Sequence, residues 1–193
     1  YQWLPKNNPS NMPTQTHFFG KMEEGQFKLL LNWGSNSTVS IPDRKMVARG
    51  LSKLEMLVVA DIFNTETAQF WKEEGLNPAK IPTEVIFLPA AFVYEKAGSM
   101  TNSSRLIQWK EVALKPLNDV HPDLDMLDHI FKKVRTLYAG SNDPKDEPIL
   151  KANWDYGPHE AEPLKVLQEL GGYNDTTGKP IASIGEYLAA PVG

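Results

Sequence analysis

The sequence contains no cysteine and only four histidines. Without cysteine, these residues form no disulfide, supply no thiolate ligand and hold no cysteine-bound iron–sulfur cluster. The histidines are scattered, and no two have the spacing that places a pair of ligands on one helical turn: His17, His121, His129 and His159. We therefore expect no metal site within this chain.

Long apolar runs and an excess of charge of one sign are also absent. No run approaches the ~20 apolar residues that span a bilayer, and no stretch has the pattern of a signal peptide. The formal net charge is -4 over 193 residues, and Lys and Arg are interleaved among Asp and Glu. Such a surface does not attract a phosphate backbone. We expect neither a membrane span nor nucleic-acid binding, and the compartment stays open.

Three short apolar runs organise the first half of the chain. They predict strands at Phe27–Leu31, Leu54–Ile62 and Glu84–Leu88. Between the first two, Pro42 suits the first turn of a helix. After the second, Asn64 or Thr65 can cap a helix that carries Phe70 and Trp71 inward. This alternation predicts right-handed crossovers and a Rossmann-like α/β fold, with a mostly parallel sheet flanked by helices.

The same signals divide the chain into three segments. Residues 1–26, with Pro5, Pro9 and Pro13, are expected to be an extended lead-in. Residues 27–140 are expected to form the α/β domain. Residues 141–193 are expected to be a linker, a short helix and an irregular tail that leads to a following domain, because the start at Tyr1 rather than Met suggests a longer polypeptide.

The second half carries fewer signals, and one of them is strong. Apolar residues recur at three- and four-residue spacing from Leu124 to Tyr138, with Asp123 placed to cap this helix and Gly140 to end it. The other expected elements are a loop at Ala97–Asn102, an antiparallel or edge strand at Arg105–Trp109, a polar linker at Ser141–Pro148 and a helix at Pro163–Leu170.

Polar residues and glycine follow the predicted strands, where the loops of a parallel sheet open onto a shared ligand-binding crevice. The candidates are Gly34, Asn36, Asp61, Thr65, Glu66 and Lys96. Each also has a plain explanation: turn residue, cap of a following turn, or solvated surface charge. Only Gly34 stands where a dinucleotide fingerprint needs three glycines, and no phosphate loop is present, so neither NAD nor a simple ATP site is supported.

Read together, these residues carry a resemblance that covers nearly the whole chain. The matching motifs are WLPK at Trp3–Lys6, the Gly-x-Asn turn at 34–36, VVADIFNTETAQFWK at Val58–Lys72, the long stretch Thr83–Trp109, and the Asp123 segment. With these motifs the sequence resembles the catalytic subunit of molybdenum- or tungsten-dependent formate dehydrogenases, within the dimethyl-sulfoxide-reductase family of molybdopterin oxidoreductases. Within that family, the sequence most resembles the large respiratory type that faces the periplasm.

The resemblance implies that this region holds the guanosine and phosphate half of one molybdopterin guanine dinucleotide. Its cofactor-contacting positions fall on Gly34, Asn36, Ala60, Asp61, Lys96 and Asp123. By this reading, Asp61 takes ribose hydroxyls, Lys96 a phosphate, and Asp123 the ring N–H and amino group of guanine. Ser37 departs from the Pro of many relatives, which implies a less rigid turn.

For the whole enzyme, the resemblance implies two-electron oxidation of formate to carbon dioxide at a Mo or W centre held by two such pterins (bis-MGD). An iron–sulfur cluster elsewhere in the large subunit, and an iron–sulfur electron-transfer subunit as partner, would carry the electrons away. A periplasmic location is implied. The metal ligand and the catalytic residues belong to the remainder of the large subunit, so no catalytic residue is expected here.

Two other interpretations stay open. The chain could be a stand-alone α/β module that binds a nucleotide or another protein without redox activity. It could also be a structural remnant whose polar loops bind nothing. Binding of a guanine nucleotide would separate the formate dehydrogenase interpretation from the structural remnant.

Overall fold

A computed structural model describes residues 14–101, 107–117, 119–152 and 154–170, together with 177 and 179. The chain divides into two compact units. Unit 1 comprises the residues up to 92 and residues 116–123, and unit 2 comprises residues 93–115 and those from 124 onward. The predicted boundaries at 26 and 140 stay a prediction. The WLPK motif and most of the tail from 173 lie outside the described residues.

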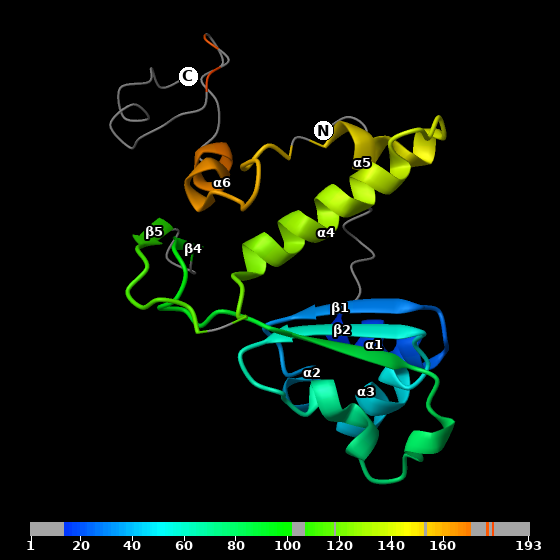
Figure 1. Cartoon of the computed structure of the whole chain (residues 1–193). Coiled ribbons are helices and arrows are strands. Elements are labelled where there is room, and N and C mark those ends of the chain that lie inside the picture. Colours follow the sequence, from blue (N-terminus) through cyan, green and yellow to red (C-terminus); the bar gives the residue numbers. More distant parts are fainter. Residues whose placement is uncertain are drawn as a thin grey trace. The chain divides into compact units, whose positions relative to one another are not determined.

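Unit 1 is built on a three-stranded parallel sheet (Figure 1). Its strands are β1 (Leu29–Trp33), β2 (Met56–Asp61) and β3 (Glu84–Pro89), in the order β1-β2-β3. Trp33 pairs with Ala60, and Asp61 pairs with Pro89, so the carboxyl ends of the strands lie level. The predicted Rossmann-like α/β fold with a parallel sheet is confirmed, and each strand lies within two residues of its predicted bounds.

The core of unit 1 lies between the sheet and its helices, which are α1 (Gln15–Glu23), α2 (Ser37–Ser40), α3 (Arg44–Leu51), and two short 3-10 helices, η2 (Thr67–Lys72) and η3 (Pro78–Lys80). Figure 1 shows α2 and α3 on one side of the strands. The buried apolar cluster contains Phe19, Met22, Ile41, Val47, Leu51, Leu54, Leu57, Val59, Ala68 and Phe70. Helix α3 begins two residues after Pro42, because Asp43 caps it by accepting from Met46 N at 3.0 Å.

The prediction of an extended lead-in is wrong for residues 15–23, which form α1. The Thr14 side chain caps this helix by accepting from His17 N at 3.2 Å. The three prolines at 5, 9 and 13 all precede this cap in the sequence, so none falls inside the helix, where proline is unfavourable. Phe19 and Met22, three residues apart, lie on one helical face and are buried in the core.

The helix predicted after Asn64 or Thr65 is also corrected. It is the 3-10 helix η2, with Glu66 before its first residue and no side-chain cap from its own segment. Gln69 has non-helical angles (φ -125°, ψ 26°), so the helix is kinked in the middle. Phe70 is buried as predicted, while Trp71 is half-buried.

Unit 2 contains an antiparallel strand pair and helices. The pair is β4 (Gly98–Thr101) and β5 (Ile107–Lys110), and the helices are α4 (Asp123–Tyr138), which starts at the end of unit 1, η4 (Pro144–Asp146), α5 (Glu147–Lys151) and α6 (Pro163–Leu170). The predicted long helix and final helix are confirmed. The predicted antiparallel strand is confirmed from Ile107 onward, and its expected first residues, 105 and 106, lie outside the described residues. The expected loop at Ala97–Asn102 is instead mostly β4, and the expected linker Ser141–Pro148 contains η4 and the start of α5, because Asp143 caps η4 through Lys145 N.

Two buried carboxylates help to hold α4 in unit 2. The buried residues of α4 are Asp125, Met126 and Asp128, while Leu137, one of the periodic apolar residues, is 73% exposed. Asp128 accepts from Trp154 Nε1 at 2.8 Å and from Lys132 Nζ at 2.7 Å. The helix is thereby tied to the segment that follows α5.

Candidate functional site

The carboxyl edge of the unit 1 sheet brings together the residues predicted after β1 and β2. Gly34 follows β1 with φ +56°, a left-handed conformation that glycine adopts without strain. Its N–H donates to the carbonyl of Ala60 at 2.8 Å, and Ala60 itself is fully buried. The β1–β2 ladder therefore continues one residue beyond the strand and fixes where the turn begins.

Asp61 ends β2 and presents a carboxylate at this edge. Its backbone carbonyl accepts from Ala90 N at 3.0 Å, and its Oδ1 accepts from Ile62 N at 2.8 Å. In the described part of the chain, Oδ2 has no hydrogen-bond partner. One oxygen thus anchors the loop after β2, and the other is free to accept a further hydrogen bond.

Two further polar atoms at this edge are buried and, within the described residues, have no hydrogen-bond partner. They are Nε1 of Trp33, the last residue of β1, and the hydroxyl oxygen of Thr65 in the loop after β2. A buried polar atom without a partner is uncommon in a folded protein and calls for an explanation such as water or ligand. Both atoms are covered by the protein, so among these groups it is the Asp61 carboxylate that keeps an oxygen free to accept a hydrogen bond.

Asn36 joins the two loops instead of pointing its amide into open space. Its Nδ2 donates to Glu66 Oε2 at 2.7 Å. Its Oδ1 accepts from the Thr67 hydroxyl at 3.0 Å, from Thr67 N at 3.3 Å and from the Thr38 hydroxyl at 3.2 Å. These contacts give Asn36 the geometry of a cross-link that sets the shape of the edge.

The hydrogen bond from Asn36 also lowers the pKa of the Glu66 carboxyl. This bond, then the backbone N–H of Glu66 itself and the positive charge of Arg44, hold the pKa of the Glu66 carboxyl below its ordinary value of 4.5. Glu66 is therefore anionic at neutral pH. A negative charge stays fixed beside the turn.

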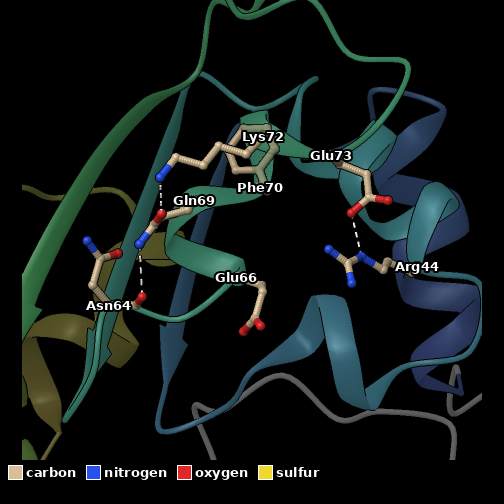
Figure 2. Close-up of a pocket in the computed structure, with 7 residues that line it drawn as sticks. All are labelled: Arg44, Asn64, Glu66, Gln69, Phe70, Lys72 and Glu73. Carbon is tan, nitrogen blue, oxygen red and sulfur yellow. Dashed lines mark hydrogen bonds and ion pairs between the residues drawn. The ribbon is translucent and has the colours of Figure 1, made fainter.

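A polar pocket of about 250 Å³ opens beside Glu66 (Figure 2). Its lining residues are Arg44, Asn64, Glu66, Gln69, Phe70, Lys72 and Glu73. Arg44 pairs with Glu73, Lys72 donates to Gln69, and Gln69 Nε2 donates to the Asn64 carbonyl at 3.0 Å. Figure 2 shows the Glu66 carboxylate and the Arg44 guanidinium directed into the same space. Charges of both signs line the pocket, so it suits a polar ligand rather than a purely anionic one.

The two remaining candidates, Lys96 and Asp123, lie outside the loops that follow β1 and β2. Lys96 belongs to unit 2, where its carbonyl accepts from Lys110 Nζ; Lys110 also donates to the Val93 carbonyl at 2.6 Å. Burial, and then the charge of Lys96, lower the pKa of Lys110. Asp123 is the first residue of α4 and the last of unit 1. Cofactor contacts by both residues, and by Gly34, Asn36, Ala60 and Asp61, stay predictions.

Sequence reasoning marked Glu66 but missed Thr38 and Thr67. Both are buried threonines in short helices, Thr38 in α2 and Thr67 at the start of η2. Their partners lie 29 and 31 residues away in sequence, so no local pattern indicates them. Asn32 had a visible signal, because it is a polar residue inside the apolar strand β1. Asn32 is 6% exposed. Its side chain donates to the Ser35 carbonyl at 2.6 Å and accepts from the Ser37 hydroxyl at 2.8 Å, and these two bonds hold the turn after β1.

Among the described residues, no group of three or more His, Cys, Asp or Glu side chains could hold a metal ion. None of the helices in that part of the chain has both the length and the apolar character that crossing a bilayer requires.

Comparisons with known proteins give consistent relatives. No protein-family model matches the chain. It is 32% identical to formate dehydrogenase subunit alpha of Megalodesulfovibrio gigas, over 90% of this chain and 17% of that protein. It is 34% identical to the nitrate-inducible formate dehydrogenase major subunit of Escherichia coli, over 98% of this chain and 20% of that protein. A more distant relative, at 27% identity over 58% of this chain, is the NADPH-Fe(3+) oxidoreductase subunit alpha of Geobacter sulfurreducens. The chain spans at most about a fifth of the length of the first two relatives.

Proposed function

The chain is homologous to one segment of the formate dehydrogenase large subunits, and we propose that it is the segment of such a subunit that binds the guanosine and phosphate half of a molybdopterin guanine dinucleotide. In this proposal the whole subunit oxidises formate to carbon dioxide. The two-electron chemistry is supplied by the bis-MGD cofactor with its Mo or W when bound. The rest of the large subunit would supply the metal ligand and the iron–sulfur cluster. The proposed enzyme would also have an iron–sulfur partner subunit and a periplasmic location.

The observation that carries the proposal is the open carboxylate oxygen of Asp61 at the carboxyl edge of the sheet. In α/β folds this edge is where nucleotides bind, with an acid accepting from ribose hydroxyls. Gly34 follows directly after the neighbouring strand β1 and has no side chain to block the approach of a ligand to the backbone. Nothing lies within 4 Å of the position that a Cβ would take there. The edge therefore fits the sugar end of a nucleotide.

The other residues have complementary roles in this proposal. Asn36 holds the turn, Lys96 supplies a positive charge to a phosphate, and the carboxylate of Asp123 accepts from the ring N–H and amino group of guanine. A hydrogen bond to a charged group contributes about 1.5–3 kcal/mol. A purine without these two donors loses that contribution, so the site should prefer guanine to adenine.

The first test measures guanine nucleotide binding by the 193-residue chain. Isothermal titration with GMP and AMP should show preferred binding of GMP, and Asp61→Asn should weaken it about tenfold, which corresponds to about 1.4 kcal/mol. Glu84→Gln is the matched control, because Glu84 is an exposed acid at the opposite end of the sheet, where β3 begins. Equal binding of GMP and AMP, or no effect of Asp61→Asn, would contradict the proposed site.

The second test concerns the larger enzyme. The intact mass of the native polypeptide that contains residues 1–193 should be several times that of the 21.7 kDa chain. A native mass equal to that of the chain would favour the alternative, a stand-alone α/β nucleotide-binding or interaction module without redox activity. The two tests are independent, because the mass carries no information about the ligand.

A further inference from the structure

Thr67 lies at the centre of a buried hydrogen-bond network between the loops that follow β1 and β2. Thr67 is 0% exposed and Thr38 is 1% exposed. The Thr67 hydroxyl donates to Asn36 Oδ1 at 3.0 Å, and it accepts from Thr38 N at 3.1 Å. A hydroxyl has one proton and two lone pairs, so both of these bonds form at the same time.

The same network caps η2 from a distant part of the sequence. Thr67 N donates to Asn36 Oδ1 at 3.3 Å, although the two residues are 31 positions apart. Asn36 Nδ2 holds Glu66, the residue before η2, at 2.7 Å. The start of η2 is thus set by the turn after β1, rather than by Asn64 or Thr65 in its own segment.

Both loops begin at residues of the proposed nucleotide-binding edge. The turn after β1 begins at Gly34, whose N–H is bonded to Ala60. The loop after β2 begins at Asp61, whose Oδ1 holds Ile62 N. Each loop is therefore fixed at its start by the strands and at its end by the network around Thr67. Loss of the second attachment would leave Gly34 and Asp61 held from one side only.

We propose that Thr67 is a positioning residue of the nucleotide-binding edge. Its hydroxyl bridges Thr38 N and Asn36 Oδ1 and thereby holds the 34–36 turn against the 62–66 loop. In this arrangement Gly34 and Asp61 are presented to the same ligand. This inference rests on the proposed function. The hydroxyl is buried within the protein, so Thr67 acts through Asn36 and touches no ligand.

The test compares three variants of the 193-residue chain by titration with GMP. Thr67→Val keeps the shape of the side chain and removes the hydroxyl, so the Kd for GMP should rise about tenfold. Thr67→Ser restores the hydroxyl and should bind GMP within about twofold of the wild type. Thr83→Val is the matched control: the Thr83 hydroxyl lies 2.8 Å from the carbonyls of Leu51 and Leu54, away from the carboxyl edge. It should lower the Tm and leave the Kd unchanged.

A second measurement reads the network without any ligand. The Thr38 N–H donates to the Thr67 hydroxyl, so its hydrogen exchange, followed by NMR, should be faster in Thr67→Val and unchanged in Thr83→Val. This readout also shows whether the variants are folded, because the exchange of core amides in β2 should stay slow in all of them.

The outcomes separate this inference from the proposed function. If the wild type binds GMP and Thr67→Val binds it equally well, or if Thr83→Val loses as much affinity, the positioning role is overturned. If the wild type binds no GMP, the proposed function fails, and with it the ligand assigned to this edge. In that case unchanged exchange of the Thr38 amide would overturn the network itself, whereas faster exchange would leave it as a purely structural connection.

Discussion

Asn36 Nδ2 donates a 2.7 Å hydrogen bond to Glu66 Oε2 across 30 residues of sequence. This contact joins the turn after β1 to the residue that precedes η2. It also explains why the Glu66 carboxyl has a pKa below its ordinary value although the side chain is exposed. The bond therefore couples the charge of Glu66 to the shape of the carboxyl edge.

Stability should depend on the protonation of Glu66. A folded-state pKa that lies below the unfolded-state value means that the ionised carboxylate stabilises the fold above pH 4.5, and that this contribution disappears as the pH falls through the folded-state pKa. Glu66→Gln removes the titration. As the pH falls through 4.5 and below, the urea midpoint of the wild type should therefore fall more steeply than that of the variant.

Glu74→Gln provides the control for this measurement. The Glu74 side chain is 88% exposed and lies 3.8 Å from Lys45, a weak surface pair. Its pH profile should follow that of the wild type. Parallel profiles of the wild type and Glu66→Gln would show that the Asn36–Glu66 bond is not coupled to folding.

Asp128→Ala should destabilise unit 2 by about 2 kcal/mol, because it removes hydrogen bonds to Lys132 and Trp154 from a fully buried carboxylate. The loss stays below the 3–5 kcal/mol typical of a broken buried ion pair, since the Lys132 side chain is one-third exposed. Urea unfolding followed by Trp fluorescence measures it. Asp155→Ala, at an exposed neighbour of Trp154, should change stability by less than about 0.5 kcal/mol. Equal effects of the two substitutions would contradict the role of Asp128.

Asp125 should make the pH dependence run the other way. Burial raises the pKa of its carboxyl, and the negative charges of Glu160 and Asp128 raise it further. The hydrogen bond from Ala161 N to Asp125 Oδ1, 3.1 Å long, and the nearby His129 lower it in part. When a folded-state pKa lies above the unfolded-state value, ionisation costs stability, so this group favours folding more as the pH falls. Asp125→Asn keeps an oxygen for Ala161 N. It should therefore be more stable than the wild type at pH 7 and lose that advantage on acidification, as measured by urea midpoints.

The parallel sheet was predictable because its signal is local. Each strand is a short apolar run that ends at glycine, a polar residue or proline, and the helix between β1 and β2 follows a proline. The same reasoning failed at α1. The three prolines before it predicted an extended segment, but Thr14 caps a helix that begins after them. Proline restricts the residue before it but not a helix that begins after it.

The carboxyl edge was predictable in position but not in detail. The strand ends identified Gly34 and Asp61, because a parallel sheet brings these ends together. The link from Asn36 to Thr67 was not predictable, since it joins residues 31 apart whose side chains meet only after the sheet has formed. The long helix shows the same limit: the spacing of its apolar residues predicted α4, yet two of its three buried residues are Asp125 and Asp128. A periodic pattern identifies a helix, while the partner of each face depends on the tertiary structure.

Gly157 tests how the segment after α5 is held against α4. Its φ is +148°, and a Cβ at this position would lie 2.3 Å from the Glu160 carbonyl oxygen, well inside contact distance. Its own carbonyl accepts from Lys132 Nζ at 2.6 Å, the same ammonium that binds Asp128. Gly157→Ala should therefore both strain the backbone and disturb the buried Asp128 pair, at a cost of about 2 kcal/mol. That cost corresponds to a fall in Tm of about 4–8 °C for a chain of this size.

Gly140→Ala is the matched control, because nothing lies within 4 Å of the position that its Cβ would take. Its Tm should stay within about 2 °C of the wild type. Calorimetry of both variants, followed by Asp128→Ala in each background, completes the test. If Gly157 acts partly through Lys132, the double variant should lose less stability than the sum of the losses in Gly157→Ala and Asp128→Ala, since both substitutions weaken one network. Full additivity would mean that Gly157 is required for its backbone conformation alone.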